Sequence, residues 1–316
     1  MYKLSVITPC YNEAENVEEC ATRLAEHFRN ELPHLDYEHI FIDNSSKDET
    51  VLILKNLAKV NPKIKIIVNS RNVGPFRSMW FGLQHATGNA IIPMLPADLQ
   101  DPPEVIKDLV KGWEAGFLIN YGIRKNRQER LLMRGIRTLY YKLINRLSPQ
   151  EIPLNAGEFM LIDRQVADSI LGTDDHYPYI RGLVAQTGLK SNMVEYVWIA
   201  RRKGKSKNSI IDLIDQGING FVSTGKALTR LSLLSGILIA LGGFAAAIVT
   251  FISAVLHPSD FQLGIPTIVI SIFVFSGVQL IFLGIIGEYV LSTHSQVRRT
   301  PAVFAIEKIN FPDNLP

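Results

Sequence analysis

Hydrophobic and polar positions follow two different periods along the first two hundred residues. Short apolar runs, typical of buried strands, alternate with longer segments whose apolar residues recur at helical spacing. Strands are predicted at residues 4–9, 37–43, 64–69, 90–95, 117–121, 159–162 and 193–200, and helices at 13–29, 47–60, 75–86, 102–115, about 127–147 and in parts of 164–188. This order predicts an α/β domain with a mainly parallel sheet covered on both faces.

Two long uncharged runs follow this domain. Residues 231–259 and 261–287 contain no Asp, Glu, Lys or Arg, and Asp260 alone separates them. A helix needs about 20 apolar residues to cross a bilayer, so each run is long enough for one crossing. Transmembrane helices are therefore predicted at about 231–256 and 263–287. Two buried helices of a soluble core are the alternative.

Residues 209–230 carry apolar side chains at roughly helical spacing, with Asp, Asn and Lys between them. This pattern suits a helix lying on a membrane surface, and a helix packed on the soluble domain is the alternative. The predicted organisation is a domain at 1–208, an amphipathic helix at 209–230, a membrane hairpin within 231–291 and a tail at 292–316.

Positive charge is distributed unevenly around the predicted hairpin. Lys226, Arg230, Arg298 and Arg299 flank it, whereas the connector at 257–262 has no Lys or Arg. The positive-inside rule then places both flanks in the cytoplasm. The N-terminus does not resemble a signal peptide. We therefore expect a multi-pass protein of the plasma (inner) membrane with its α/β domain in the cytoplasm.

Acidic residues follow the predicted strand at 90–95. Ligands of open α/β sheets bind outside the carboxyl ends of the strands, where Asp98 is expected to lie. A carboxylate there can hold a divalent cation, which in turn can hold a diphosphate. Asp101 directly precedes Pro102 and Pro103, and Asp is a good helix N-cap, so we expect it to begin the next helix.

The other strand ends are also polar, but they lack the glycine-rich dinucleotide-binding motif and the P-loop lysine motif. The first strand leads into residues 8–13, the second into 42–50 and the third into 69–75. In a doubly wound sheet these segments meet at one edge. Asn12 is available to cap the first helix.

Taken together, these segments resemble family 2 glycosyltransferases with the GT-A fold, which is Rossmann-like. More narrowly, the chain is similar to the polyprenyl-phosphate glycosyltransferases, the group of dolichyl-phosphate mannose synthase and the bacterial GtrB-type enzymes. The resemblance spans nearly the whole chain. It rests on residues 9–13 (P-x-Y-N-E), 43–50 (similar to D-D-G-S-x-D-x-T), 72–75 (N-x-G-x), 97–103 (A-D-L-Q-D-P-P), 201–207 (R-x-x-G-x-S-K) and 287–289 (G-E-Y).

The resemblance implies an inverting transfer of a sugar from a nucleotide-sugar to an undecaprenyl- or dolichyl-type phosphate, assisted by Mg²⁺ or Mn²⁺. It implies that Asp98 holds the metal and that Asp43 faces the base. The implied partners are the nucleotide-sugar donor, the lipid acceptor and the bilayer, and nucleic acid is not among them. Whether the protein forms a homo-oligomer is left open. The implied donor pocket comprises Pro9, Tyr11, Glu13, Asp43, Asn72, Gly74 and Asp98, and the implied phosphate-binding residues are Arg134, Arg201 and Lys207.

The chain departs from the family pattern at two places. Pro96 replaces the first Asp of the D-x-D metal motif. In the segment that resembles D-x-G-D-F-R-L, Asn155 and Glu158 occupy the acidic positions and Met160 replaces the Arg. A phosphate monoester is mostly anionic at neutral pH, so its attack needs positioning and charge screening more than a strong base.

We therefore expect Glu158 to be a positioning residue or weak base, with Asn155 and Arg201 as the other catalytic groups. The departures also motivate an alternative, a catalytically silent relative that scaffolds or regulates membrane glycan assembly. A transporter subunit is a third hypothesis, although the predicted crossings carry no charged residue to line a path.

Overall fold

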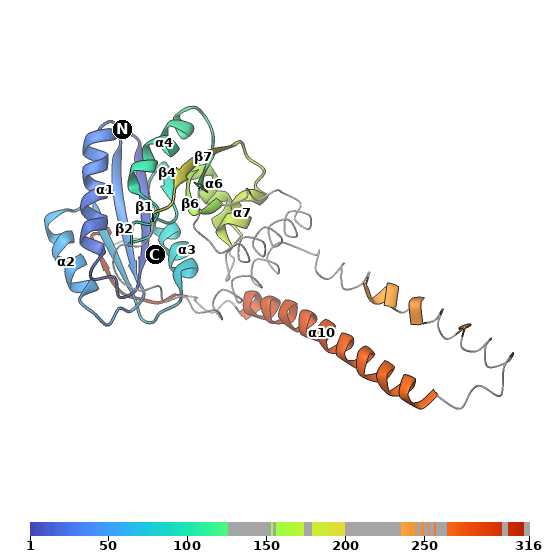
Figure 1. The fold of residues 1–316 in the computed structure, drawn as a ribbon. Coiled ribbons are helices and arrows are strands. Elements are labelled where there is room, and N and C mark those ends of the chain that lie inside the picture. The colour runs from blue at the N-terminus through green and yellow to red at the C-terminus, as the bar shows by residue number, and fades with distance from the viewer. Residues whose placement is uncertain are drawn as a thin grey trace. The chain divides into compact units, whose positions relative to one another are not determined.

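The computed structural model describes residues 1–125, 153, 156–173, 179–199, parts of 235–256, 264–298 and 303–312. The chain divides into two compact units (Figure 1). The first comprises Met1–Asn219 together with Arg299–Pro316, and the second comprises Gly220–Arg298.

The first unit is built on an eight-stranded sheet with the order β7-β5-β6-β4-β1-β2-β3-β8. The strand β1 is parallel to β2 and β4, β2 to β3, and β5 to β7. Among the described strands, only β6 and β8 run antiparallel to their neighbours. The bounds are β1 Lys3–Cys10, β2 Asp36–Asp43, β3 Ile64–Asn69, β4 Ala90–Ile92, β5 Ile119–Lys125, β6 Ala156–Asp163, β7 Ser191–Val197 and β8 Ala305–Ile309.

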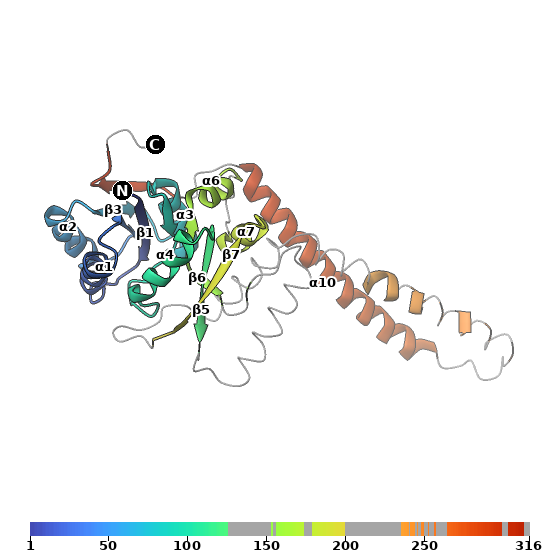
Figure 2. The ribbon, with the colours of Figure 1, turned by 90° about the horizontal axis from the view of Figure 1, so that it is seen from above.

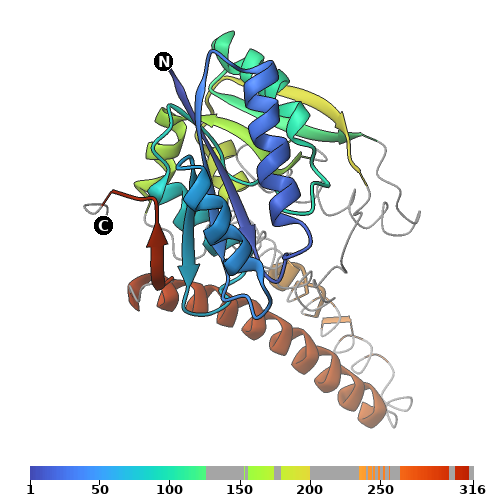
Figure 3. The same ribbon diagram turned by 90° about the vertical axis from the view of Figure 1, so that its left-hand side faces the viewer.

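Helices cover both faces of this sheet (Figures 2 and 3). Alternate residues of a strand point to opposite faces, so Ile40 and Ile42 pack on one side and Phe41 on the other. One face carries α1, α2 and α4, and the other carries α3, α6 and α7. The helices are α1 Val17–Glu31, α2 Thr50–Val60, α3 Pro75–His85, α4 Ile106–Glu114, α6 Arg164–Leu171 and α7 Ile180–Gln186, with a short 3₁₀ helix, η1, at Pro103–Val105.

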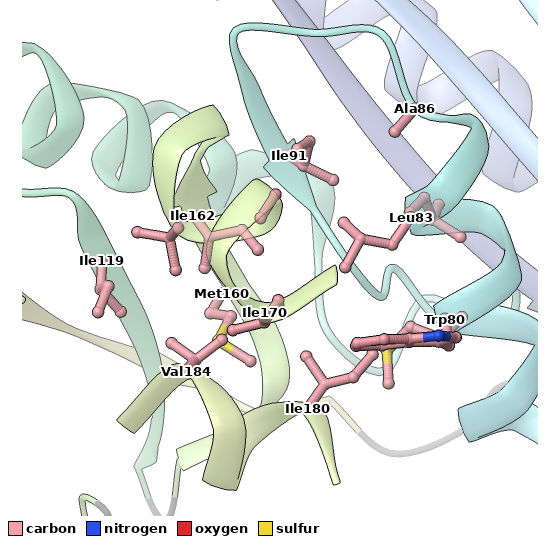
Figure 4. Packing of buried hydrophobic residues seen from close by; sticks show 14 of the residues in the cluster. Trp80, Leu83, Ala86, Ile91, Ile119, Met160, Ile162, Ile170, Ile180 and Val184 are labelled. Carbon is pink, nitrogen blue, oxygen red and sulfur yellow. The ribbon is translucent and has the colours of Figure 1, made fainter. Parts of the chain in front are cut away.

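The second face shows how the core joins distant segments. Trp80 and Leu83 of α3 pack in one cluster with Met160 of β6 and with Ile180 and Val184 of α7 (Figure 4). The core thereby fixes α7 against β6, which bears one of the predicted site residues.

The predicted α/β fold with a mainly parallel sheet is confirmed, and the seven predicted strands lie near their expected positions. The first helix begins at Val17 rather than at 13, because the backbone amides of Asn16 and Val17 both donate to the carbonyl of Glu13 in a preceding turn. Asn12 therefore does not cap it. The predicted helices at 127–147 and 209–230 lie outside the described residues.

The strand β8 is an element that the sequence pattern did not reveal. It lies within the predicted tail and pairs with β3 at the edge of the sheet (Figure 3). In this pairing Ile309 is opposite Ile66. The side-chain amide of Asn310 donates to the carbonyls of Ala58 (3.0 Å) and Ile64 (2.8 Å). Residues 305–309 are thus an edge strand of the same sheet as residues 3–10.

The second unit contains α10, which runs over Gly264–Arg298 and spans the predicted segment 263–287 almost completely. Within the described residues, no helix combines the length and the apolar character that crossing a bilayer requires. The predicted transmembrane hairpin is therefore not confirmed.

Candidate functional site

The carboxyl ends of four neighbouring strands gather most of the predicted site residues. Pro9 lies at the end of β1, Asp43 ends β2, and Asp98 follows β4. Because β6 is antiparallel to β4, its amino end with Glu158 lies at the same edge. The loops after β1 and β3 add Tyr11, Glu13, Asn72 and Gly74, whereas Arg134, Asn155, Arg201 and Lys207 lie outside the described residues.

The loops after β1 and β2 are tied together through Asn12. Its backbone N–H donates to Ser46 Oγ (2.8 Å), and its Oδ1 accepts from the backbone N–H of Lys47 (2.7 Å). The backbone N–H of Glu13 donates to Thr50 Oγ1 (2.9 Å). Asn12 has φ = +51°, a left-handed conformation that Asn tolerates better than most residues. The segment that bears Tyr11 and Glu13 is therefore held by the loop after β2 and by the first residue of α2.

Asp43 is completely buried. Its carboxylate accepts hydrogen bonds from the backbone N–H of Ser46 (2.9 Å) and from Ser46 Oγ. Burial raises the pKa of Asp43, and the bonds from Ser46 oppose that rise. Asp43 thus closes the turn that contains Ser45, and its contact with the base of a nucleotide stays a prediction.

Asn44 joins three segments at this edge. Its Oδ1 accepts hydrogen bonds from Ser78 Oγ (2.6 Å), from Asn69 Nδ2 (3.1 Å) and from the backbone N–H of Val73 (3.4 Å). This buried amide links β2, the end of β3 and the first turn of α3. It fixes the loop of Asn72 and Gly74, where Gly74 has φ = +84° directly before α3. Sequence reasoning had assigned no role to Asn44.

Asp98 lies in a small pocket between the loop after β4 and α1. Its Oδ1 accepts from the backbone N–H of Gln100 (3.2 Å). The pocket is lined by Asn16, Glu19, Arg23, Ala97, Asp98, Leu99 and Ile199. Asp98 as a whole residue is partly exposed at this pocket.

The donor set suits a metal held mainly by substrate. Among the described residues, no group of three or more His, Cys, Asp or Glu side chains is placed to hold a metal ion. Mg²⁺ commonly binds through one or two carboxylates and completes its shell with phosphate oxygens and water. A single carboxylate at Asp98 fits that pattern.

The prediction that Asp101 begins the next helix is wrong. The residue before η1 is Pro102, and in the described part of the chain no side chain caps that helix. Asp101 is instead 1% exposed and receives two hydrogen bonds from Arg124, at 3.0 Å from Nε and 2.7 Å from the second terminal nitrogen. The Tyr196 hydroxyl donates a third (2.5 Å). An ion pair in the core holds Asp101 more strongly than a helix end at the surface could.

This network of Asp101, Arg124 and Tyr196 connects the Asp98 loop to β5 and β7. A Cβ atom at Gly157 of β6 would lie 3.2 Å from the Arg124 guanidinium, which is a tight contact, so glycine leaves room for the guanidinium at this point. Sequence reasoning assigns Arg124 no acidic partner, and only the fold reveals it.

Glu158 lies on β6 and is 8% exposed. Its Oε1 lies 3.8 Å from Nε of Arg181 on α7, and its Oε2 has no hydrogen-bond partner in the described part of the chain. Burial raises the pKa of Glu158, and the guanidinium groups of Arg181 and Arg124 oppose this rise. Met160, which replaces the Arg of the family pattern, is fully buried in the core (Figure 4). Sequence reasoning had missed Arg181, which lies far from the motifs.

Comparison with known proteins agrees with this arrangement. Residues 5–171 match the family described as Glycosyl transferase family 2. An uncharacterized glycosyltransferase of Synechocystis sp. is 33% identical over 301 residues, covering 95% of this chain and 93% of the relative. The bactoprenol glucosyl transferase of Shigella phage SfII is 31% identical over 300 residues, covering 95% and 96%. A crystal structure of a mycobacterial protein shares the fold with a TM-score of 0.50 and 17% identity, covering 70% of this chain and 73% of that one.

Proposed function

Because the chain belongs to glycosyl transferase family 2, and is therefore a glycosyltransferase, we propose that it transfers a sugar from a nucleotide-sugar to a polyprenyl phosphate. The observation that carries this proposal is the gathering of Asp43, Asp98 and Glu158 at one edge of the sheet. That edge is where open α/β sheets bind their ligands.

The nature of the acceptor is supported by the relatives. Several of them are named bactoprenol glucosyl transferases, and each aligns with 95% of this chain. The similarity thus extends past the sheet domain into the apolar C-terminal third. Because these relatives are named for the lipid bactoprenol, we take a polyprenyl phosphate as the acceptor of this chain.

In the proposed reaction, an oxygen of the lipid phosphate attacks the anomeric carbon of the donor sugar. The bond from that carbon to the nucleoside diphosphate breaks, and the configuration inverts. Asp98 would hold Mg²⁺ or Mn²⁺, which when bound neutralises charge on the diphosphate. Glu158 positions the reactants or accepts a weakly held proton. In this proposal Arg134, Arg201 and Lys207 bind the phosphate groups, and Asn155 and Arg201 act with Glu158 as the catalytic residues.

Pro9, Tyr11, Glu13, Asn72 and Gly74 complete the donor pocket in this proposal. The hydrogen bonds of Asn12 and Asn44 to neighbouring loops support a preformed pocket, which lowers the entropic cost of binding. Positioning is the main requirement for an acceptor that is already anionic at neutral pH.

We further propose that the enzyme is a multi-pass protein of the plasma (inner) membrane with its catalytic domain in the cytoplasm. The uncharged runs at 231–259 and 261–287 are each long enough to cross a bilayer. Because β8 pairs with β3, the chain must return to the side of the membrane that holds the sheet. An even number of crossings meets that requirement, and self-association is compatible with it.

The test mixes purified full-length protein with undecaprenyl phosphate, Mg²⁺ or Mn²⁺ and a panel of labelled nucleotide-sugars. We expect one donor to yield a labelled glycolipid. Failure with every donor by folded protein would refute the proposal. Calorimetry then examines the scaffold alternative, because an enzyme binds a nucleoside diphosphate in a metal-dependent manner and a silent scaffold does not.

A further inference from the structure

The side chain of Arg181 is fixed from several directions at the start of α7. It is 13% exposed. Its Nε and one terminal nitrogen donate to the Tyr179 hydroxyl, at 3.1 and 2.8 Å, and its other terminal nitrogen donates to the carbonyl of Ala156. A guanidinium held in this way has a defined direction, because the planar group and its donors move as one unit.

The fixed guanidinium lies beside the one acidic side chain of β6 at the candidate site. Ala156 and Glu158 are two residues apart on a strand, so they share a face of the sheet. Arg181 therefore contacts the strand at Ala156 and comes within 3.8 Å of Glu158 Oε1. Its Nε approaches one carboxylate oxygen, and the other, Oε2, lacks a hydrogen-bond partner within the described residues.

The second carboxylate oxygen of Glu158 is the unusual feature of this pair. Oε2 of Glu158 is buried, and within the described residues it accepts no hydrogen bond. Leaving a buried polar atom unpaired is costly, so native proteins rarely do so without a reason. A substrate group that donates to Oε2 when it binds would supply the missing partner.

We propose that Arg181 is a positioning residue that holds Oε1 of Glu158 and thereby presents Oε2 to the bound substrate. This inference rests on the proposed function, since it assumes that Glu158 meets the substrate. Arg181 itself acts through Glu158 and need not touch the reacting atoms.

The charged and titratable groups around Glu158 define the expected pH behaviour. Arg181 and Tyr179 lie on the side of α7, and Tyr121 and Arg124 lie on β5. Burial raises the pKa of Glu158 and the Arg181 guanidinium opposes that rise. Replacing Arg181 with a neutral side chain therefore moves the ionisation of Glu158 to higher pH.

A double-mutant cycle tests the pair without any substrate. We would measure urea unfolding of the full-length wild type, Arg181→Met, Glu158→Gln and the double variant from pH 5 to pH 8. The loss of unfolding free energy in Arg181→Met, relative to the wild type, should grow as pH rises, because an ionised Glu158 then lacks its partner. In the Glu158→Gln background this pH dependence should be absent. Additive effects at every pH would overturn the inference.

Activity measurements supply the second readout. We expect Arg181→Met to lower kcat about 100-fold with little change in donor KM, a typical effect of misplacing a catalytic group. The acid limb of its pH profile should move to higher pH, and Arg181→Lys should restore part of kcat and the position of that limb. Retention of wild-type kcat and pH profile by Arg181→Met would contradict the positioning role.

Arg164→Met is the matched control. Arg164 also donates to buried backbone carbonyls, those of Ala86 (2.8 Å) and Gly88 (2.9 Å), but lies at the opposite edge of the sheet from Glu158. The Arg164→Met variant should be less stable than the wild type, but the pH profile of its kcat should not shift. An equal shift in both variants would overturn the inference. If the wild type transfers no sugar at all, the proposed function fails, and the unfolding cycle still decides whether Arg181 and Glu158 are coupled.

Discussion

Replacing Asp101 with Ala should destabilise the catalytic domain strongly. The substitution removes the acceptor of two hydrogen bonds from Arg124 and one from Tyr196, at 3.0, 2.7 and 2.5 Å. Arg124 is 20% exposed, so its guanidinium would stay mostly buried without a counterion. The hydroxyl of Tyr196 would lose its acceptor as well.

The magnitude follows from the geometry of the ion pair. Two unit charges 2.7 Å apart attract by about 6 kcal/mol at an effective dielectric constant of about 20. Desolvation of both groups offsets part of this attraction, and breaking one partner of a buried pair typically costs about 3–5 kcal/mol. For a domain of this size the corresponding fall in Tm is roughly 10 °C.

Urea unfolding and thermal melts of the full-length protein measure this effect. Asp108→Ala is the matched control, because Asp108 pairs with Lys111 on the same segment but both side chains are exposed, by 49% and 66%. That pair should contribute less than about 0.5 kcal/mol. If Asp101→Ala is no less stable than Asp108→Ala, the buried network does not stabilise the loop of Asp98 and the reasoning fails.

Three further predictions concern other residues of the sheet and its edge. The carboxylate of Glu38 pairs with Lys3 and Lys65, and its pKa is lowered to about 2, so it stabilises the fold above pH 4.5 and this stabilisation disappears as pH falls toward 2. Glu38→Gln should therefore lower the free energy of unfolding in urea by roughly 3 kcal/mol at pH 7 and by progressively less below pH 4.5. A loss of stability that does not depend on pH would contradict this. Ser45 has φ = +61°, which glycine adopts without strain, so Ser45→Gly should raise stability by about 1 kcal/mol, and a lower Tm would argue against strain there. Pro96 and Asp98 are both partly exposed while Ala97 between them is buried, so Pro96→Asp should tighten Mn²⁺ binding in calorimetry and speed sugar transfer; unchanged affinity would mean that Asp98 suffices.

The strands of the central sheet could be predicted because their side chains are buried on both faces. Segments such as 64–69 are buried throughout, so their apolar runs are continuous. In contrast, β8 is an edge strand in which Ile306 is 70% exposed and the central residues are charged. Its pairing depends on β3, on Asn310 and on the ion pair of Glu307 with Lys55, none of which a local pattern can reveal.

The candidate site was predictable where short motifs follow strands. The topology then brings these strand ends together, as with Asp43 and Asp98. The sequence could not reveal partners from distant segments, because the residues around a charged side chain do not indicate which distant residue will form its ion pair. The local sequence predicted a helix cap at Asp101, whereas the fold places Arg124 beside it as an ion-pair partner. The role proposed for Arg181 likewise depends on its position near Glu158, which only the fold shows.

The most direct test of the central claim is the stoichiometry of a single assay. Purified protein is incubated with the preferred nucleotide-sugar and divalent metal, with and without polyprenyl phosphate, while nucleoside diphosphate and glycolipid are both quantified. A polyprenyl-phosphate glycosyltransferase should release one diphosphate per glycolipid, only when the lipid is present, and Asp98→Asn should slow both together. Release that does not depend on the lipid phosphate, or lipid without attached sugar, would contradict the proposed function.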